Sequence, residues 1–545
     1  MRRSLLVMAA AGAAATFALA PSASHATRNG QQQGASRALS IATAKAVTVQ
    51  PDGKVVAGGM RGGAGYTDDP AESADFALAR YQTNGRLDPS FGKGGRVTTD
   101  FGSSSDWLWA IVRQPNGKIV AAGSSRPRSG VSGFALARYD SRGRLDPSFG
   151  KHGKVRVHFG RSGSTAYAIA LQPDGKIVAA GSIHGEHESW VVARVNANGT
   201  LDRSFGDGGA VTTAFAASSE ADAVTVDSNG KIVVLGDSCQ TEDPWTGCRL
   251  VLARYKVDGS LDPSFGSGGM ATTEFPGFDD VTGEGVTVQP DGKIVAAATP
   301  GRNSDDNYDF ALARYNDDGS VDSSFGTGGT VITDFEAGSD ESFDDAWNLA
   351  LGPDGVIVVA GATARGFTVA LYDGRGKLDP SFGGTGFVQT DLSGESVARA
   401  VAIAPGGKIV AAGAVDDTRF VLVRYARDGA LDPGFGKDGK VFTVFGSPIT
   451  VLASFAAADK DHGVLAQWRT VVEVNARGFN VYRDQKGRRV RVNRKLLPSK
   501  GTSARGASYS FLDKAAPRHG AIRYWLQVVK RDGKRVWYGS VVPER

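Results

Sequence analysis

The sequence predicts an all-β protein, a seven-bladed β-propeller of four-stranded antiparallel blades followed by a small β-sandwich. One pattern of short apolar segments and turns occurs seven times between residues 39 and 445. Its turns carry the Pro-Asp-Gly and Asp-Gly pairs of tight hairpins. The last hundred or so residues lack this pattern and instead alternate polar and apolar positions. Repeats of four short strands arranged radially make a propeller, and this observation predicts the architecture.

A turn of the form Gln-Pro-Asp-Gly-Lys marks each repeat. The turn glycines of successive copies are 52 to 64 residues apart, which is slightly longer than a usual propeller-blade repeat. A second signature, Leu-Asp-Pro-Ser-Phe-Gly or a close variant, follows every turn. The seven turns begin at Gln50, Gln114, Gln172, Asp227, Gln289, Gly352 and Ala404. Seven copies therefore predict seven blades.

Each copy reads as four strands. The first ends at the turn, as in Ala46–Val49, and the second is Lys-Ile-Val-Ala-Ala-Gly or similar. In the fifth copy the third strand is expected at Phe310–Tyr315 and the fourth at Gly329–Phe335. The middle strands are apolar on both faces, which is typical of a sheet packed between two others.

These motifs carry a family resemblance. The runs AVTVQPDGKIVAAG, FALARY, LDPSFGxGG and VxTDF resemble the delta-60 repeat, a bacterial family of exported or surface proteins without an assigned activity. The blade layout is also similar to NHL-type propellers. Departures are local: Ser228-Asn229 replaces Pro-Asp, and Val356 and Leu371 replace a Lys and an Arg in the sixth copy. The resemblance implies the fold and adds little about chemistry.

The N-terminus predicts export. Residues 1–26 read as a secretory signal, with two arginines before the apolar run Leu5–Ala20 and cleavage after Ala26, or alternatively after Ala20. A twin-arginine signal is the other interpretation. Residues 27–38 predict a disordered arm and residues 39–446 the propeller. No later segment has the apolar length of a membrane span, so we expect a secreted protein, extracellular or loosely associated with the cell wall.

Residues 449–545 predict the sandwich. The run WRTVVEVNARGFNVYR resembles a bacterial fibronectin type III-like module, which implies a spacer or weak binder. This segment holds 20 Lys and Arg against seven Asp and Glu. Six of the basic residues are concentrated in one hairpin and its exit: Arg488, Arg489, Arg491, Arg494, Lys495 and Lys500. They predict attraction to an anionic cell-wall polymer or membrane surface, or else a solvated strand; nucleic acid is not an expected partner outside the cell.

The candidate binding face holds the loops that differ between copies. There, near the start of each first strand, we expect aromatic and charged side chains around a central mouth, where they hold a sugar or peptide or else pack between blades. The ligand-binding candidates are Lys45, Trp107, Trp109, Tyr167, Trp347 and Arg399. If the protein is an enzyme, the same region offers the carboxylates Asp222, Glu284 and Asp345.

Other residues predict structural roles. An Arg in the third strand precedes an Asp by eight residues, and a buried guanidinium needs an anion. The expected ion pairs are Arg80–Asp88, Arg138–Asp146, Arg254–Asp262 and Arg314–Asp322. In the sixth copy, where Leu371 replaces the Arg, Asp379 is expected to cap its own turn.

Two loops carry further candidates. Cys239 and Cys248 are the two cysteines of the chain and predict a disulfide in an exported protein. A loop with His184, Glu186, His187 and Glu188 offers metal-ligand types, although such clusters also arise by chance.

The sequence thus predicts an exported, non-enzymatic binding or structural protein that recognises an extracellular glycan, peptide or protein. No cofactor is expected. The alternative is an extracellular polysaccharide hydrolase or lyase with its site at the central mouth, because propeller enzymes assemble their sites from the loops of several blades.

Overall fold

The structure is a computed structural model of the chain. It describes residues 42–62, 74–102, 105–127, 130–185, 188–215, 218–240, 247–302, 307–335, 344–445, 450–460, 462–473, 476–485, 488–501, 506–517, 522–531, 533 and 535–543. The predicted signal and arm, residues 1–38, lie outside these ranges. Contacts divide the chain into two compact units, with the boundary between Thr443 and Val444.

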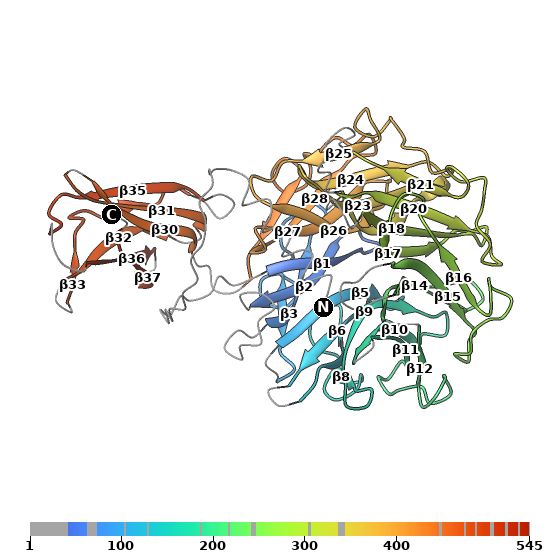
Figure 1. Cartoon of the computed structure of the whole chain (residues 1–545). Coiled ribbons are helices and arrows are strands. Elements are labelled where there is room, and N and C mark those ends of the chain that lie inside the picture. The colour runs from blue at the N-terminus through green and yellow to red at the C-terminus, as the bar shows by residue number, and fades with distance from the viewer. Residues whose placement is uncertain are drawn as a thin grey trace. The chain divides into compact units, whose positions relative to one another are not determined.

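The first unit consists of seven antiparallel sheets, each built from four strands that are consecutive in the chain (Figure 1). The first strands are β1 (Ala42–Val49), β5 (Ser105–Arg113), β9 (Gly163–Leu171), β13 (Ser218–Val226), β17 (Asp280–Val288), β22 (Asp345–Leu351) and β26 (Ser396–Ile403). The second strands are β2 (Val55–Gly62), β6 (Ile119–Arg126), β10 (Ile177–His184), β14 (Ile232–Cys239), β18 (Ile294–Arg302), β23 (Ile357–Thr363) and β27 (Ile409–Val415).

The outer half of each sheet completes the blade. The third strands are β3 (Ala74–Tyr81), β7 (Gly133–Tyr139), β11 (Ser189–Val195), β15 (Arg249–Tyr255), β20 (Phe310–Tyr315), β24 (Gly366–Tyr372) and β28 (Arg419–Tyr425). The fourth strands are β4 (Arg96–Thr99), β8 (Lys154–Val157), β12 (Ala210–Thr213), β16 (Met270–Thr273), β21 (Thr330–Thr333), β25 (Phe387–Thr390) and β29 (Lys440–Thr443). A two-residue strand, β19 (Asn307–Tyr308), also pairs with β18, and one 3₁₀ turn covers Pro353–Gly355.

The first strands form the inner ring of the propeller. Each contacts the first strand of the next blade, and β26 of the seventh blade contacts β1 of the first. Figure 1 shows β1, β5, β9 and β17 toward the centre and β8, β12, β16 and β25 at the rim. The predicted seven-bladed propeller is confirmed.

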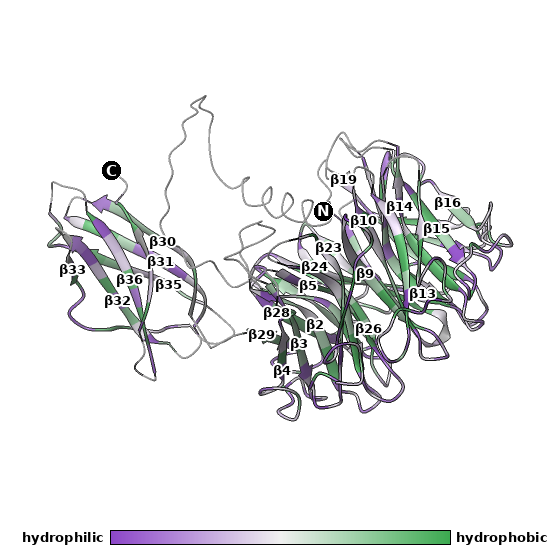
Figure 2. Ribbon diagram, turned by 90° about the horizontal axis from the view of Figure 1, so that it is seen from below, coloured by the Kyte–Doolittle hydropathy of each residue, from purple (hydrophilic) through white to green (hydrophobic). Residues whose placement is uncertain are grey.

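Apolar packing between blades supplies the core. Val56, Phe76 and Leu78 of the first blade pack with Ile119 and Tyr139 of the second in one buried cluster. Figure 2 shows the green, hydrophobic colouring along the strands. The phenylalanine of every Leu-Asp-Pro-Ser-Phe-Gly signature is fully buried, at Phe91, Phe149, Phe205, Phe265, Phe325, Phe382 and Phe435. Burial of each such ring contributes about 2 to 3 kcal/mol, which explains why the signature recurs.

The fourth strand is shorter than predicted. We expected Gly329–Phe335, but β21 covers Thr330–Thr333. Gly329 has a φ of 99° and donates its N–H to Phe325 O, so it belongs to the preceding turn. At the other end Phe335 N–H donates to the Asp344 side chain at 2.7 Å and leaves the ladder.

The first and last blades meet without exchanging a strand. Tyr81 Oη donates to Thr443 Oγ1 at 2.8 Å, Arg424 Nη1 donates to Thr83 O at 2.6 Å, and Gly436 N–H donates to Asn84 O at 2.8 Å. The same three kinds of contact join neighbouring blades elsewhere in the ring. Closure therefore depends on side chains and turns.

The second unit contains two antiparallel sheets. One has the order β30-β31-β35 and the other β33-β32-β36-β37, with β34 also paired to β32. The strands are β30 (Thr450–Lys460), β31 (Gly463–Glu473), β32 (Ala476–Gln485), β33 (Arg488–Arg491), β34 (Leu497–Pro498), β35 (Ser508–Asp513), β36 (Arg523–Lys530) and β37 (Arg535–Val541). Trp468 and Tyr509 of the first sheet share a core with Phe479, Tyr524 and Leu526 of the second. Among the residues described, no helix has the length and apolarity to cross a membrane.

Candidate binding site on the inner strands

Every innermost strand carries a β-bulge at the same place. In each blade the pairing with the second strand skips one residue of the first strand. The skipped residues are Lys45, Trp109, Tyr167, Asp222, Glu284, Trp347 and Arg399. Bulges re-aim side chains and are frequent next to functional sites. One side chain from each of seven blades is thus set apart from the ladder on the inner ring.

The second strand makes room for the bulge with a glycine. A Cβ on Gly181 would lie 1.9 Å from Thr165 O, and a Cβ on Gly59 would lie 1.9 Å from Thr43 O. The final glycine of the Lys-Ile-Val-Ala-Ala-Gly motif is therefore required by the bulge opposite it. In the fifth blade the second strand has an alanine, Ala298, and the glycine has moved to its partner on the first strand, Gly283.

Five of the six predicted ligand-binding residues lie on this ring, and their side chains meet. Lys45 Nζ lies 4.4 Å from the centre of the Trp109 ring and 5.9 Å from that of Trp347. Arg399 Cζ lies 4.5 Å from the Trp347 ring centre. Trp109 and Tyr167 pack edge to face, with centroids 5.4 Å apart. Since Lys45, Trp109 and Trp347 come from the first, second and sixth blades, the contacts join blades that are not all sequence neighbours.

The sixth candidate, Trp107, flanks the ring. Its centroid is 6.4 Å from that of Trp109, two residues further along β5. The structure thus brings all six ligand-binding candidates into one connected group of aromatic and basic side chains.

Two members of this group have buried hydrogen-bond donors that are left without an acceptor in the described part of the chain. Arg399 is 5% exposed, and its Nε and Nη1 have no hydrogen-bond acceptor among the described residues. The same holds for the buried Nε1 of Trp109. A buried donor without an acceptor costs roughly 1 to 3 kcal/mol, so a ligand with hydroxyl or carboxylate oxygens would recover that free energy here.

The three carboxylates of the enzyme interpretation occupy different settings. Asp222 and Glu284 are bulge residues of the fourth and fifth blades and are buried. Asp345 stands two residues before Trp347, outside the bulge positions, and its Oδ1 accepts a hydrogen bond from Thr299 Oγ1 at 3.0 Å. Asp345 therefore links β22 to the neighbouring fifth blade.

The third-strand arginines pair with aspartates inside the scaffold. The Nε to Oδ2 distances are 3.0 Å for Arg80–Asp88, 2.8 Å for Arg138–Asp146, 2.9 Å for Arg254–Asp262, and 2.7 Å for Arg314–Asp322, Arg194–Asp202 and Arg424–Asp432. Each guanidinium also donates to a backbone oxygen of the next blade, as Arg80 Nη1 does to Ser141 O at 2.6 Å. In the sixth blade, Asp379 accepts the N–H of Ser381 at 2.9 Å and caps its own turn.

Sequence reasoning missed the second cation of this network. The lysine of each Pro-Asp-Gly-Lys turn reaches the same aspartate, for example Lys118 Nζ to Asp146 Oδ2 at 2.7 Å. Burial alone would raise the pKa of Asp88, but hydrogen bonds from Ser90 and the charges of Arg80 and Lys54 outweigh it and lower the pKa to about 2. The sequence contains a signal for this lysine–aspartate contact, because the sixth copy has lost the lysine and the arginine together.

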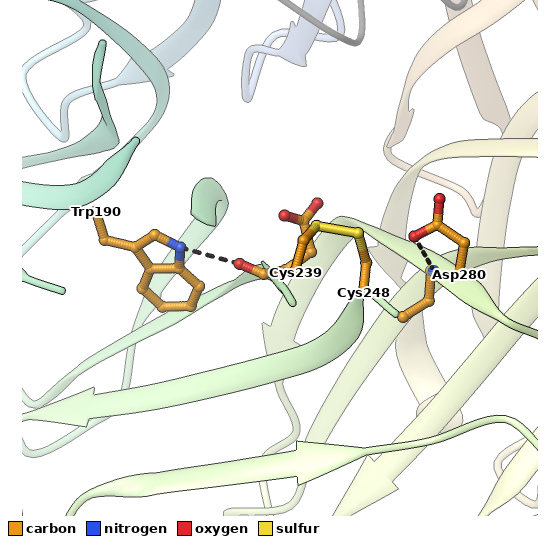
Figure 3. The surroundings of a disulfide bond; sticks show 6 residues. Trp190, Cys239, Cys248 and Asp280 are labelled. Carbon is orange, nitrogen blue, oxygen red and sulfur yellow. Dashed lines mark hydrogen bonds between the residues drawn. A yellow bond between two sulfur atoms is a disulfide. The ribbon is translucent and has the colours of Figure 1, made fainter. Parts of the chain in front are cut away.

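Cys239 and Cys248 form a disulfide between the end of β14 and the start of β15 (Figure 3). Beside it, Trp190 Nε1 donates to Asp237 O at 3.3 Å. Asp280 lies close enough to the two sulfurs to complete a group of metal-ligand types. Because the sulfurs are bonded to each other, they have no thiolate for a metal.

The predicted histidine cluster is partly described. His184 Nδ1 lies 3.1 Å from Glu188 Oε1, and His184 Nε2 lies 3.1 Å from Thr165 Oγ1. Both ring nitrogens therefore contact protein atoms. Burial would raise the pKa of Glu188, but its hydrogen bonds with His184 and Glu220 lower it. Glu186 and His187 lie outside the described residues.

The basic hairpin of the second unit includes an aromatic stack. The Arg489 guanidinium lies 3.6 Å from the Trp525 ring centre and 5.1 Å from that of Trp537. Arg491 Nη2 donates to Arg494 O at 2.5 Å. The neighbouring Val490 is 48% exposed, so the strand that carries these residues has a solvent-facing side.

A surface groove of about 750 Å³ lies away from the inner ring. It runs along β12 and is lined by Phe159, Val211, Asp207 and Asp258, among others. Turn residues that recur in every blade form much of its wall, so we place the candidate site at the bulge residues.

Comparison with known proteins finds a family similar to six of the repeats. Six segments match the family described as "Domain of unknown function (DUF5122) beta-propeller": residues 50–91, 114–149, 172–205, 228–265, 289–325 and 405–435. The sixth repeat, with its altered turn and strand, falls between the last two matches. No curated protein matches this sequence.

Several solved structures are similar to this chain at low identity. A protein of unknown function from Dyadobacter fermentans has 13% identity and a TM-score of 0.35, covering 58% of this chain and 88% of its own. PorZ, a surface component of the type-IX secretion system of Porphyromonas gingivalis, has 10% identity and a TM-score of 0.26, covering 91% and 81%. Prolyl oligopeptidase B from Galerina marginata has 12% identity and a TM-score of 0.39, covering 80% and 56%. Six of the seven repeats in the propeller of this chain are thus similar to the DUF5122 beta-propeller domain.

Proposed function

We propose that this protein is an exported, non-enzymatic binding protein whose bulge residues recognise an extracellular glycan, with a peptide or protein as the other ligand classes. The observation that carries the proposal is the ring of seven bulge residues, in which Lys45 contacts Trp109 and Trp347 from different blades. Indole faces stack on the apolar faces of sugars, while the unsatisfied donors of Arg399 and Trp109 suit hydroxyl or carboxylate oxygens.

The packing of the aromatic residues favours recognition over catalysis. The lysine and arginine of the ring lie over the tryptophan rings. One of the three carboxylates of the enzyme interpretation, Asp345, is engaged by Thr299. A polysaccharide hydrolase or lyase that uses Asp222 and Glu284 is the second candidate, because these carboxylates occupy adjacent positions on the same ring.

The second unit acts in this proposal as a fibronectin type III-like spacer or tether. Its three-stranded and five-stranded sheets around one core support that module type. Its excess of basic residues supports attachment to an anionic cell-wall polymer.

The test is binding of the full chain without its signal to a panel of extracellular and cell-wall glycans, with product analysis of every glycan that binds. Binding without product, weakened at least tenfold by Trp109→Ala or Trp347→Ala, supports the proposal. Released oligosaccharide that disappears in Asp222→Asn or Glu284→Gln supports the enzyme. Val490→Ala, on the second unit, serves as the control variant that leaves propeller binding unchanged.

A further inference from the structure

Three acidic side chains converge where the fifth blade meets the sixth. Asp309 immediately precedes β20, Asp334 immediately follows β21, and Asp344 immediately precedes β22. One carboxylate oxygen of each lies within 4.8 Å of the others. Asp344 is fully buried and Asp309 is 4% exposed, whereas Asp334 is exposed to solvent.

The register of the sheet makes this arrangement costly without a cation. Phe310 pairs with Thr333 across β20 and β21, so Asp309 and Asp334 stand opposite each other at the next position. Like charges directly opposite in a sheet are destabilising. Asp309 Oδ1 is buried and accepts no hydrogen bond from any described residue, which is a second and separate sign of an absent partner.

Other blades show how the same position is balanced. In the first blade Asp75 and Asp100 occupy the equivalent places, and Asp106 completes the triad. There Arg61 Nη2 binds Asp75 Oδ2 at 2.9 Å and supplies the positive charge. In the fifth blade the residue opposite Asp309 is Pro300, whose carbonyl accepts the Asp309 N–H. Pro300 therefore takes the place of Arg61, which lies opposite Asp75 in the first blade.

The fourth blade balances the position in another way. Arg249 stands where Asp309 stands in the fifth, and its Nε binds Glu274 Oε1 at 3.0 Å across the ladder. In the fifth blade the charge of Arg302 acts on Asp309, but these two described side chains form no ion pair. The Arg302 Nε donates to Gly277 O at 3.0 Å, and its guanidinium lies 4.5 Å from the Phe278 ring, so it is directed to the fourth-to-fifth connection.

We propose that Asp309, Asp334 and Asp344 form a Ca²⁺ site that joins the fifth and sixth blades. Carboxylate oxygens are the ligands that hard divalent cations take. Calcium accepts about six to eight oxygen ligands in flexible geometry, whereas magnesium demands a near-ideal octahedron and usually keeps several waters. Three carboxylates that come from separate connections of the chain therefore suit the larger ion. The exposed Asp334 leaves a side open for entry and for water ligands.

The site does not depend on the proposed glycan recognition, because none of its ligands is a bulge residue. Its role is to hold two blades together through one ion, whereas in the first blade Arg61 neutralises the equivalent Asp75 by direct pairing within the blade. The bound ion also fixes the start of β22, which carries Trp347 two residues after Asp345.

The experiment is calorimetric titration of Ca²⁺ into the full chain without its signal, after treatment with a chelator that is then removed. We expect saturable binding that weakens at least tenfold in Asp309→Asn and in Asp334→Asn. Asp75→Asn, at the equivalent site that Arg61 neutralises, is the matched control and should leave binding unchanged. Because Asp334 is exposed, its variant should keep the wild-type circular dichroism spectrum even if Asp309→Asn unfolds.

Thermal unfolding gives a second readout. Ca²⁺ should raise the melting temperature of the wild type and of Asp75→Asn but not of Asp334→Asn, and Mg²⁺ at the same concentration should raise it less. Equal calcium titrations for wild type and Asp334→Asn, or no binding by the wild type, would overturn the site.

Discussion

At the scale of single residues, the aspartate of the Leu-Asp-Pro-Ser-Phe-Gly signature organises each blade boundary. Asp88 accepts the N–H and hydroxyl of Ser90 through Oδ1 at 3.0 and 2.7 Å, and it binds Arg80 and Lys54 through Oδ2. One carboxylate therefore fixes its own turn, the third strand and the lysine of the first turn. A buried ion pair contributes little by itself, but loss of one partner leaves a buried charge, which explains why all the partners recur together.

These aspartates predict a decline of stability in acid. Their folded pKa is lowered from an unfolded value near 3.9, so their stabilisation is complete above about pH 4 and is lost as the pH falls through the folded value, about 2 for Asp88. We expect Asp88→Asn to cost about 1 to 2 kcal/mol in urea unfolding at pH 6. The difference from wild type should nearly vanish at pH 2.

Asp379→Asn is the matched control for that experiment, because Asp379 has neither the arginine nor the lysine partner. It should cost less at pH 6, because it weakens only the hydrogen bond that Asp379 accepts from Ser381 N–H. A cost for Asp88→Asn that stays constant from pH 6 to pH 2 would contradict the role assigned to its charge.

The glycine opposite each bulge gives a second prediction at this scale. Gly181→Ala places a Cβ 1.9 Å from Thr165 O, so the bulge must shift or the strands must separate. We expect a loss of at least about 2 kcal/mol in the free energy of unfolding. Gly374→Ala is the control, since its Cβ would meet only Gly355 O at 3.6 Å. Similar costs for the two variants would show that the bulge tolerates a side chain.

At the scale of elements, the disulfide ties β14 to β15 across a sequence separation of nine residues. Replacing both cysteines, Cys239→Ser with Cys248→Ser, should lower the free energy of unfolding by about 2 to 3 kcal/mol. Wild type in reducing buffer should show the same loss, and the double variant should not respond to reductant. Equal unfolding curves for oxidised and reduced wild type would contradict a stabilising role.

The strands and their order could be predicted because local rules fix them. Phe310–Tyr315 forms β20 as predicted, since an apolar run between two turn signatures has one way to bury both faces. The bulge at Trp109 was not predicted, because a skipped residue depends on the register between two strands rather than on composition. Its trace in the sequence is the glycine of the second strand, which is the last residue of the Lys-Ile-Val-Ala-Ala-Gly motif.

The candidate site divides in the same way. The ring positions of Lys45 and Trp347 could be predicted, because each residue lies five positions before the first residue of its turn and every copy of the repeat folds in the same way. The triad of Asp309, Asp334 and Asp344 was missed, since its members are separated by up to 35 residues and only the pairing of β20 with β21 brings two of them together. The strand register is also needed to see that Arg61 lies opposite Asp75 in the first blade, whereas Pro300 lies opposite Asp309 in the fifth.

At the scale of the whole molecule, the seams between blades are not equal. Five consecutive seams and the closing one carry an arginine that donates to the next blade. The sixth-to-seventh seam lacks it, because Leu371 stands in its place. That seam keeps the backbone bond from Gly383 N–H to Asp428 O at 2.8 Å and the hydroxyl contact of Tyr425 with Thr390.

The unequal seams predict where the ring opens first. Hydrogen exchange of the native protein should be faster at the sixth-to-seventh seam, in β24 and β26, than at the equivalent strands β3 and β5 of the first seam. Leu371→Arg restores a partner for Asp379 and should slow this exchange, while Leu371→Met leaves it unchanged. Uniform protection around the ring would contradict the prediction.

Each blade is one contiguous stretch of chain, and the contacts that close the ring are of the same kinds as those between its other blades. A tandem duplication of one repeat in the gene would therefore add a whole blade with seams already matched, and no older strand would need a new partner. The inner bulge residue of such a copy makes no ladder pairing, so mutation could change it without disturbing the scaffold. The mixture of aromatic, acidic and basic residues on the present ring is the pattern that this mode of inheritance would leave.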